Sequence, residues 1–190
     1  RVKYIHGFLE VLGDSINRYI TARGIEWTDK KKTIIGLSET VIYSGENRSF
    51  DVGYLNPIST HLEVELNNRL NFYGSNYSNA VWQLHVDKII FDKLRFSANI
   101  LFDELVLDPK IELEKEHGKA YAARVAYVLM NDSSFNISSY ISYLMVGTPT
   151  FRHGKGINNF VLNNKPIGWI NGSDSQELKI GVNCLYQKDQ

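Results

Sequence analysis

One pair of acidic residues in this chain has a spacing that suits acid–base chemistry. Glu63 and Glu65 are separated by a single residue, so on a strand both carboxylates would point to one face, with Cα atoms roughly 6.6–7 Å apart. This separation is close to that of the two carboxyl groups of an inverting glycosidase. The same spacing is common on the polar face of any strand. We therefore expect Glu63 and Glu65 to pair with basic residues across strands rather than to catalyse a reaction.

The other residue types used in catalysis and metal binding show no specific arrangement. The five histidines have no His-x-x-x-His spacing, which is the arrangement used by zinc sites on helices. Cys184 is the only cysteine, which excludes cysteine-rich metal motifs and an internal disulfide. Gly154-Lys155-Gly156 lacks the strand, the spacing and the hydroxyl of a phosphate-binding loop. We predict no metal, no cofactor and no enzymatic activity.

Two loop segments have a composition that suits sugar binding. Polysaccharides are held by aromatic rings that stack on sugars and by polar groups that bond hydroxyls and carboxylates. Residues 152–155 with Trp169 and Asn171 have this composition, and so do residues 43–54 with Arg48. The candidate polysaccharide-binding residues are Arg48, Arg152, His153, Lys155, Trp169 and Asn171. A solvated loop or a loop at a membrane interface is the alternative interpretation of both segments.

The element that most clearly positions such loops is a strand predicted at residues 93–102. One face carries the apolar side chains Leu94, Phe96, Ala98, Ile100 and Phe102. The other face carries polar side chains, namely Lys93, Arg95, Ser97 and Asn99. Ten residues at ~3.3 Å each reach ~33 Å, which is enough for a strand tilted by ~40° to cross an apolar band of ~25 Å. Strands of soluble proteins are usually shorter, at ~5–6 residues.

The same alternation predicts the remaining strands and therefore an all-β fold. These strands are expected at residues 1–12, 16–27, 33–43, 61–69, 80–86, 120–131, 135–146 and 177–188. A short helical turn at the start of 16–27 is equally compatible with the pattern. Glu39 falls on the apolar face of its strand, which indicates either a bulge or a strand covered by protein on both faces. We predict one domain over residues 1–190 with seven to nine antiparallel strands.

Composition limits the partners of this domain. The 21 basic and 21 acidic residues give a net charge of zero, so there is no global attraction to nucleic acid. No apolar run approaches the ~20 residues of a membrane-spanning helix. Aromatic residues make up 12% of the chain, with 11 tyrosines, as expected for aromatic girdles at two membrane interfaces or for a Tyr-rich soluble β protein. The chain begins without Met and its last strand stops in mid-pattern, so we expect part of a larger barrel.

Alternation alone does not distinguish a soluble sandwich from a transmembrane barrel, because the two differ only in which face meets water. Three features favour the barrel: strand length, aromatic residues near strand ends, and ionisable residues in mid-strand on one face. Long loops at one end and short turns at the other are also typical of outer-membrane barrels. The residues predicted to face the lumen are Glu63, Glu65, Arg69, His85, Asp87, Lys93, Arg95 and Arg124.

Several short stretches occur in an order that points to a known family. They are residues 17–19, 25–27, 35–43, 54–57 and 101–104, and Gly168 with residues 172–175. Together they resemble the Wzi-type capsule assembly proteins, which are outer-membrane barrels that hold capsular polysaccharide on Gram-negative bacteria. The resemblance implies an antiparallel transmembrane β-barrel, of which this chain supplies about 8–9 strands. It also implies a location in the bacterial outer membrane.

The function that the resemblance implies is the non-enzymatic binding of capsular or other surface polysaccharide through extracellular loops. The partners would be that polysaccharide and the lipid bilayer, with no nucleic acid. Two alternatives stay open on the residues alone. The same barrel with an open lumen would be a diffusion channel, or the chain would be a soluble all-β carbohydrate-binding domain.

Overall fold

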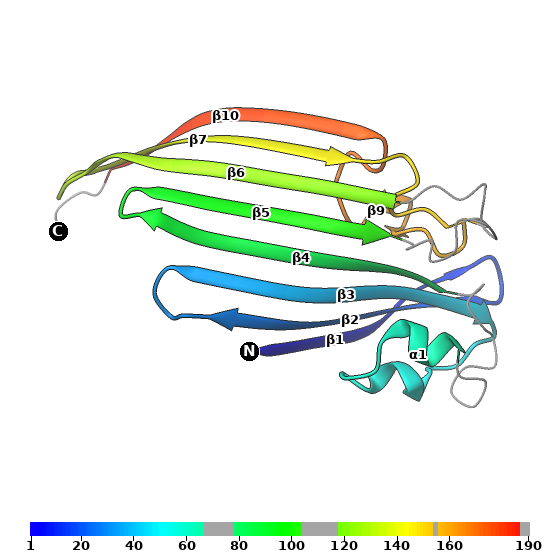
Figure 1. Cartoon of the computed structure of the whole chain (residues 1–190). Helices are drawn as coiled ribbons and strands as arrows, with labels where there is room; N and C mark the ends of the chain where they lie inside the picture. The colour runs from blue at the N-terminus through cyan, green and yellow to red at the C-terminus, as the bar shows by residue number, and fades with distance from the viewer. Residues whose placement is uncertain (67–77, 104–117, 154–155, 187–190) are drawn as a thin grey trace, which may run out of the picture.

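The structure is a computed structural model that describes residues 1–66, 78–103, 118–153 and 156–186. Its main element is one antiparallel sheet of eight strands (Figure 1). In sheet order these are β1 (Val2–Leu12), β2 (Ile16–Thr28), β3 (Thr33–Glu46), β4 (Ser78–Phe91), β5 (Leu94–Asp103), β6 (Gly118–Asn131), β7 (Phe135–Val146) and β10 (Ser175–Tyr186). The predicted all-β, antiparallel fold is therefore confirmed, and residues 16–27 are strand throughout.

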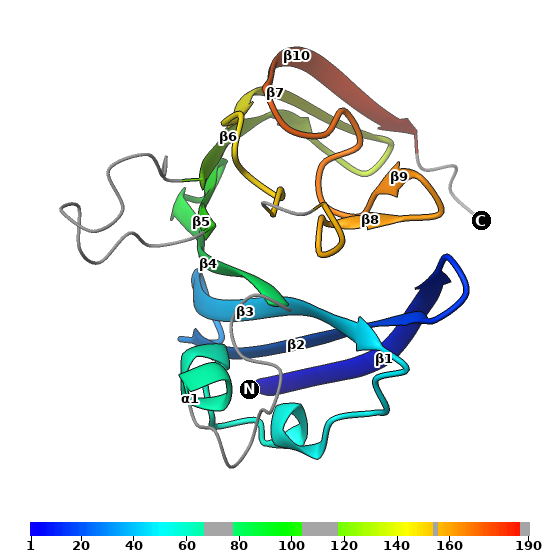
Figure 2. The same cartoon turned by 90° about the vertical axis from the view of Figure 1, so that its right-hand side faces the viewer.

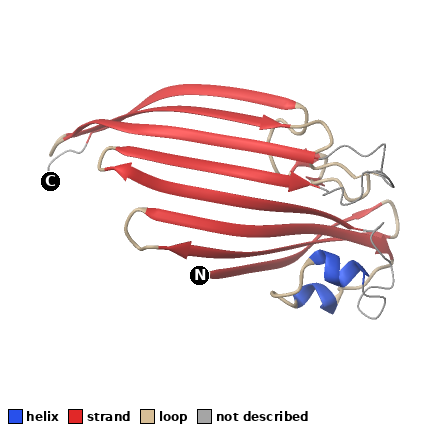
Figure 3. Ribbon diagram, in the orientation of Figure 1, coloured by secondary structure: helices blue, strands red, loops and turns tan. Residues whose placement is uncertain are grey.

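Four short elements lie in the connections between these strands (Figure 3). The β3–β4 connection contains a 3-10 helix, η1 (Val52–Leu55), and a short helix, α1 (His61–Leu66). The β7–β10 connection contains a small hairpin of β8 (Val161–Leu162) and β9 (Lys165–Pro166). These two long connections lie at one end of the strands, and the turns after β2, β4 and β6 lie at the other (Figure 1).

Local sequence explains why the turns at this second end are short. In the β2–β3 turn, Oδ1 of Asp29 accepts hydrogen bonds from the backbone N–H groups of Lys31, Lys32 and Thr33, at 2.8–2.9 Å. In the β6–β7 turn, Oδ1 of Asp132 accepts from the backbone N–H of Phe135 at 2.7 Å. Asp side chains favour turns because they replace main-chain partners in this way.

The sheet is strongly curved and open (Figure 2). Viewed along the strands it forms an arc, with β1 and β10 at its two ends and the β8–β9 hairpin in the hollow. Among the described residues β1 and β10 each pair on one side only. The concave face is the one that packs against the β7–β10 connection, since Phe151 and Phe160 of that segment contact Ile42 and Val81 of the sheet.

The opposite, convex face is apolar and largely uncovered. One cross-strand row on this face joins Ile25, Leu37, Leu84 and Ile100 through the register of β2 to β5. The exposed fraction is 61% for Ile25 and 76% for Ile180, which is on the same face. Other exposed members are Trp27, Ile35, Phe91, Tyr121, Val125, Tyr127, Ile141, Tyr143, Leu178, Val182 and Tyr186. The apolar face of β5 belongs to the same surface, and no second sheet packs on it within the described residues.

Two buried clusters hold the connections against the loop end of the sheet. On the convex face, Tyr54 of η1 and Val64 of α1 pack on strand residues, namely Tyr19, Val41, Tyr43 and Ala80. The ring of Tyr43 is stacked between those of Tyr19 and Tyr54, with centroid distances of 5.1 and 4.2 Å. On the concave face, the β7–β10 connection forms the second cluster.

The strand predicted at residues 61–69 is wrong, because residues 61–66 form α1. Thr60 begins this helix: its backbone O accepts from the N–H of Val64 and its hydroxyl from the N–H of Glu63, at 3.3 Å each. Glu63 and Glu65 therefore lie on a helix, and this helix is outside the arc of the sheet. Arg69 lies outside the described residues.

Candidate functional site

The β7–β10 connection is tied to the concave face by buried polar groups. Arg18 of β2 donates hydrogen bonds to the backbone oxygens of Asn159, at 2.6 Å, and Val161, at 2.9 Å. The carboxylate of Asp103 at the end of β5 accepts from the backbone N–H of Phe151. Both anchoring side chains are almost fully buried. The segment is therefore held in a defined position on the sheet.

The positive charge of the buried Arg18 is balanced by a carboxylate. Glu10 of β1 forms an ion pair with its guanidinium, and the second oxygen of Glu10 accepts from the backbone N–H of Asn163 at 3.1 Å. A buried charge without such a partner would strongly destabilise the fold. Side chains of β1, β2 and β5 thus fix the connection to the sheet at Phe151 and at residues 159–163.

A cavity of about 390 Å³ lies between this segment and the sheet. Trp169 lines it from the connection, while Thr40, Gln83 and Asn99 line it from strands β3, β4 and β5. Gln83 Nε2 donates to Asn99 Oδ1 at 2.8 Å. The described residues supply no further hydrogen bond to these two amides, so Gln83 Oε1 remains as an acceptor and Asn99 Nδ2 as a donor for a ligand.

Trp169 brings an aromatic ring to this cavity. Its side chain is half-buried, and its indole N–H has no hydrogen-bond partner among the described residues. The Nζ atom of Lys179 lies 5.6 Å from the ring centroid. A ring beside free amide groups has the composition of a sugar-binding pocket, in which stacking supplies contact area and polar groups supply orientation.

The concave face also carries four of the residues that the sequence predicts to face a lumen. His85, Asp87, Arg95 and Arg124 all lie on this face by strand register. Asp87 accepts from Arg95 Nε at 3.0 Å. The guanidinium of Arg124 stacks on a neighbouring ring, 4.1 Å from the centroid of Tyr140.

Lys93 occupies a different position from the one predicted. It lies in the β4–β5 turn rather than on a strand, because Asp92 and Lys93 reverse the chain after a bulge at the end of β4. It still lines a second cavity, of about 480 Å³, together with Arg95, Ser97 and Arg124. In the same turn, Asp92 pairs with Lys32 of the β2–β3 turn at 2.9 Å. This ammonium lowers the pKa of Asp92.

Arg48 does not fit the sugar-binding role predicted for it. Its side chain is almost fully buried, with Nη1 donating to the backbone O of Ser44 at 2.9 Å and Nη2 to Asp51 at 2.8 Å. Its guanidinium lies 4.6 Å from the centroid of the Tyr43 ring. Arg48 therefore stabilises the start of the β3–β4 connection and presents no surface to a polysaccharide.

The remaining candidates lie on the β7–β10 connection. Arg152 and Asn171 are exposed. His153 is half-buried, and its backbone N–H donates to Oδ1 of Asn159 at 2.7 Å. Lys155 lies outside the described residues. The sequence did not single out Thr40, Gln83 and Asn99 as site residues. The alternation of apolar and polar residues did place Gln83 and Asn99 on polar strand faces.

Comparisons of the chain with protein-family models, curated proteins and solved structures find no match. Within the part of the chain that the structure describes, no group of three or more His, Cys, Asp or Glu side chains could hold a metal ion. None of the described helices has the length and apolar character needed to cross a membrane.

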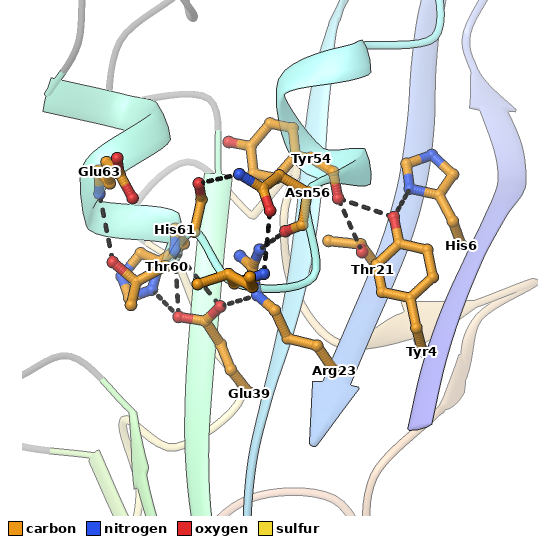
Figure 4. Close-up of polar contacts among 12 residues, drawn as sticks. Tyr4, His6, Thr21, Arg23, Glu39, Tyr54, Asn56, Thr60, His61 and Glu63 are labelled. Atoms are coloured by element: carbon orange, nitrogen blue, oxygen red, sulfur yellow. Dashed lines mark hydrogen bonds and ion pairs between the residues drawn. The ribbon is translucent and has the colours of Figure 1, made fainter. Parts of the chain in front are cut away.

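A third polar group of residues lies on the convex face, where the β3–β4 connection covers the strands (Figure 4). Arg23 Nε donates to Glu39 Oε2 at 2.5 Å, and its Nη1 donates to the backbone O of Asn56 at 2.8 Å. His61 Nδ1 lies 2.5 Å from the other oxygen of Glu39. The register of β3 is continuous at Glu39 on both sides. The bulge is therefore excluded, and Glu39 is buried because the β3–β4 connection covers its face of the strand.

Proposed function

We propose that this chain is part of an outer-membrane β-barrel that binds surface polysaccharide without catalysing a reaction, as its resemblance to Wzi-type capsule assembly proteins implies. The convex apolar face supports the membrane location. Its exposed side chains extend over strands β2 to β10, and soluble monomers rarely expose apolar side chains over a large continuous surface. Such a surface would be in contact with lipid acyl chains in a membrane. The polar concave face would then line the lumen.

The dimensions of the apolar face match a bilayer. On β4, Trp82 and Phe91 both point to the convex face and are nine residues apart. At ~3.3 Å per residue they are ~30 Å apart, and a strand tilt of ~40° reduces this to ~23 Å along the membrane normal. Trp27 is next to the end of β2, and Tyr127 and Tyr186 pair with the first residues of β5 and β7, so all three lie near the same turn end as Phe91. Lys88 is also on this face, close enough to the turn end for its ammonium to reach the headgroups.

Closure of the barrel is part of the proposal. β1 and β10 each leave one row of backbone N–H and C=O groups without a strand partner among the described residues. In a bilayer every such group must be satisfied by another strand. We propose that further strands pair with both edges and complete a larger barrel.

The observation that carries the sugar-binding role is the cavity of Trp169. An aromatic ring and two amide groups that line one cavity suit a sugar ring with its hydroxyls. The cavity is at the end of the sheet that bears the long connections, where outer-membrane barrels carry their extracellular loops.

The membrane location is tested with single-tryptophan variants, since the chain has only Trp27, Trp82 and Trp169. In bilayers of brominated phospholipid, we expect the fluorescence of a Trp27-only protein to be quenched and that of a Trp169-only protein to be retained. Equal quenching of the two, or quenching of neither, would contradict the proposed orientation. A protein that stays dispersed without detergent would instead support the soluble carbohydrate-binding alternative.

The sugar-binding role is tested with Trp169→Ala. We expect the Kd for capsular polysaccharide to rise roughly two- to tenfold, because a stacked aromatic ring contributes ~0.5–1.5 kcal/mol. Trp27→Ala removes a ring of the same size from the convex face and should leave the Kd unchanged. Equal affinities of wild type and Trp169→Ala would contradict this site.

A diffusion channel is the second candidate function, favoured by the cavity that Lys93, Arg95 and Arg124 line on the concave face. Planar-bilayer conductance separates the two functions. A channel would conduct, and Arg124→Gln would lower its preference for anions. A barrel narrowed by the β7–β10 connection would stay closed.

A further inference from the structure

A groove of about 510 Å³ lies on the convex face, between the β3–β4 connection and strands β2 to β4. Its size is within the ~300–1,000 Å³ range of ligand pockets. Residues 57–60 form one wall, and the sheet forms the floor. It is separate from the cavity of Trp169, which lies on the other face of the sheet.

One end of the groove is polar and holds hydrogen-bond donors. Arg23 is 93% buried there, and its Nη2 has no hydrogen-bond partner among the described residues. Ser59 accepts from Asn56 Nδ2 at 2.7 Å, and the hydroxyl of Thr60 accepts a backbone N–H (Figure 4). Both hydroxyls keep a proton to donate. Because Glu39 neutralises Arg23, this end suits an oxygen-rich group that accepts hydrogen bonds.

The other end is apolar and opens onto the convex face. Ile25 and Leu37 form its floor, and both are exposed members of the apolar surface. Trp82 also lines the groove, in the neighbouring cross-strand row with Arg23 and Glu39. Ile58 lines the groove with 88% of its surface exposed. A ligand in the groove would therefore have one polar end and an apolar part that continues along the sheet.

We infer that the groove binds a single bilayer phospholipid. Its phosphate or ester oxygens would accept from Arg23, Ser59 and Thr60, and one acyl chain would lie along Ile25 and Leu37. The inference rests on the proposed membrane location, because continuity with a lipid-facing surface identifies the occupant. A lipid held in this way would join the β3–β4 connection to the membrane.

Trp82 reports directly on the groove. We would prepare a Trp82-only protein (Trp27→Phe and Trp169→Phe) in detergent micelles and titrate phospholipid brominated on its acyl chains. We expect Trp82 quenching to reach a plateau at a low mole fraction of lipid, as for one saturable site. The Trp27-only protein is the matched control, and its quenching should rise in proportion to the lipid fraction.

Two variants separate a specific site from general lipid contact. In the Trp82-only protein, Leu37→Phe fills the groove and should raise the lipid fraction at half-quenching at least tenfold. Ile180→Phe adds the same bulk to the convex face far from the groove and should not change it. Ser59→Ala with Thr60→Val removes both hydroxyl donors and should weaken binding without filling space.

The outcomes distinguish this inference from the proposed function. Proportional quenching of Trp82 that Leu37→Phe leaves unchanged would overturn the groove while the membrane location stands. If Trp27 is also unquenched in brominated bilayers, the membrane location fails and the lipid site fails with it. Circular dichroism of each variant checks that the strand content is retained.

Discussion

The ring of Tyr140 on β7 lies over Gly181, the residue directly opposite it on β10. A Cβ atom at position 181 would be 2.7 Å from three atoms of that side chain. The same relationship joins His85 and Gly36, which also face one another across two strands. Both pairs lie on the concave face, where curvature crowds the side chains. Glycine in one strand gives the opposite ring room to lie flat.

Gly181→Ala should displace the ring of Tyr140 and, with it, the stacked guanidinium of Arg124. We expect the free energy of unfolding to fall by about 1–2 kcal/mol, the range for overpacking a tight contact. Chemical denaturation measures this change. Gly7→Ala is the matched control on β1, because its nearest atom would be 3.9 Å away. A Gly181→Ala protein as stable as Gly7→Ala would contradict the steric argument.

Glu39→Leu should destabilise the protein by about 3–5 kcal/mol, because it leaves the buried Arg23 without its carboxylate. The double variant Glu39→Leu, Arg23→Met removes both charges and should recover a large part of the loss. Denaturation of wild type, both single variants and the double variant forms a double-mutant cycle. Additive losses in that cycle would mean that the two side chains do not interact.

The carboxyl of Asp29 should titrate well below an ordinary aspartate. Hydrogen bonds from the backbone N–H groups of Thr33, Lys31 and Lys32 lower its pKa from 3.8 to about 2. Since the folded pKa is the lower one, the carboxylate stabilises the turn above pH ~4, and this stabilisation is lost as pH falls towards 2. Carbon-13 NMR of the side-chain carboxyl would measure the pKa. A value near 4 would show that these bonds do not form in solution.

Asp103→Ala should loosen the β7–β10 connection, because the backbone N–H of Phe151 loses its carboxylate acceptor. A hydrogen bond to a charged group contributes about 1.5–3 kcal/mol. We expect faster proteolysis within this connection and weaker polysaccharide binding, although Trp169 itself is unchanged. Asp174→Ala is the control: it removes an exposed carboxylate from the same segment, one that bonds the hydroxyl of Thr148 at 3.0 Å. Equal cleavage rates for the two variants would rule out the anchoring role.

The strands could be predicted from the sequence because alternation is a local property that repeats over ten or more residues. The segment at 61–69 shows the limit of this argument. Its apolar residues also alternate, but the helix is decided by the cap at Thr60 and by the burial of Val64 against the sheet. Over so few residues, a period of two does not exclude a helix.

The site residues were predictable only where strand register decides their position. His85, Asp87, Arg95 and Arg124 share a face because each follows the pattern of its strand. Burial of Arg48 depends on Tyr43, Tyr54 and Asp51 coming together in space, which no spacing encodes. For the same reason, the sequence nominated Trp169 but not the amides of Gln83 and Asn99, which line the same cavity.

The order of strands in the sheet has a consequence for how the chain folds. Short turns join β1 to β2, β2 to β3, β4 to β5 and β6 to β7, so each of these hairpins can form without waiting for distant segments. Low contact order of this kind favours rapid assembly. Two pairings cross long connections instead: β3 with β4 across residues 47–77, and β7 with β10 across residues 147–174. We expect these two steps to be the slowest in folding.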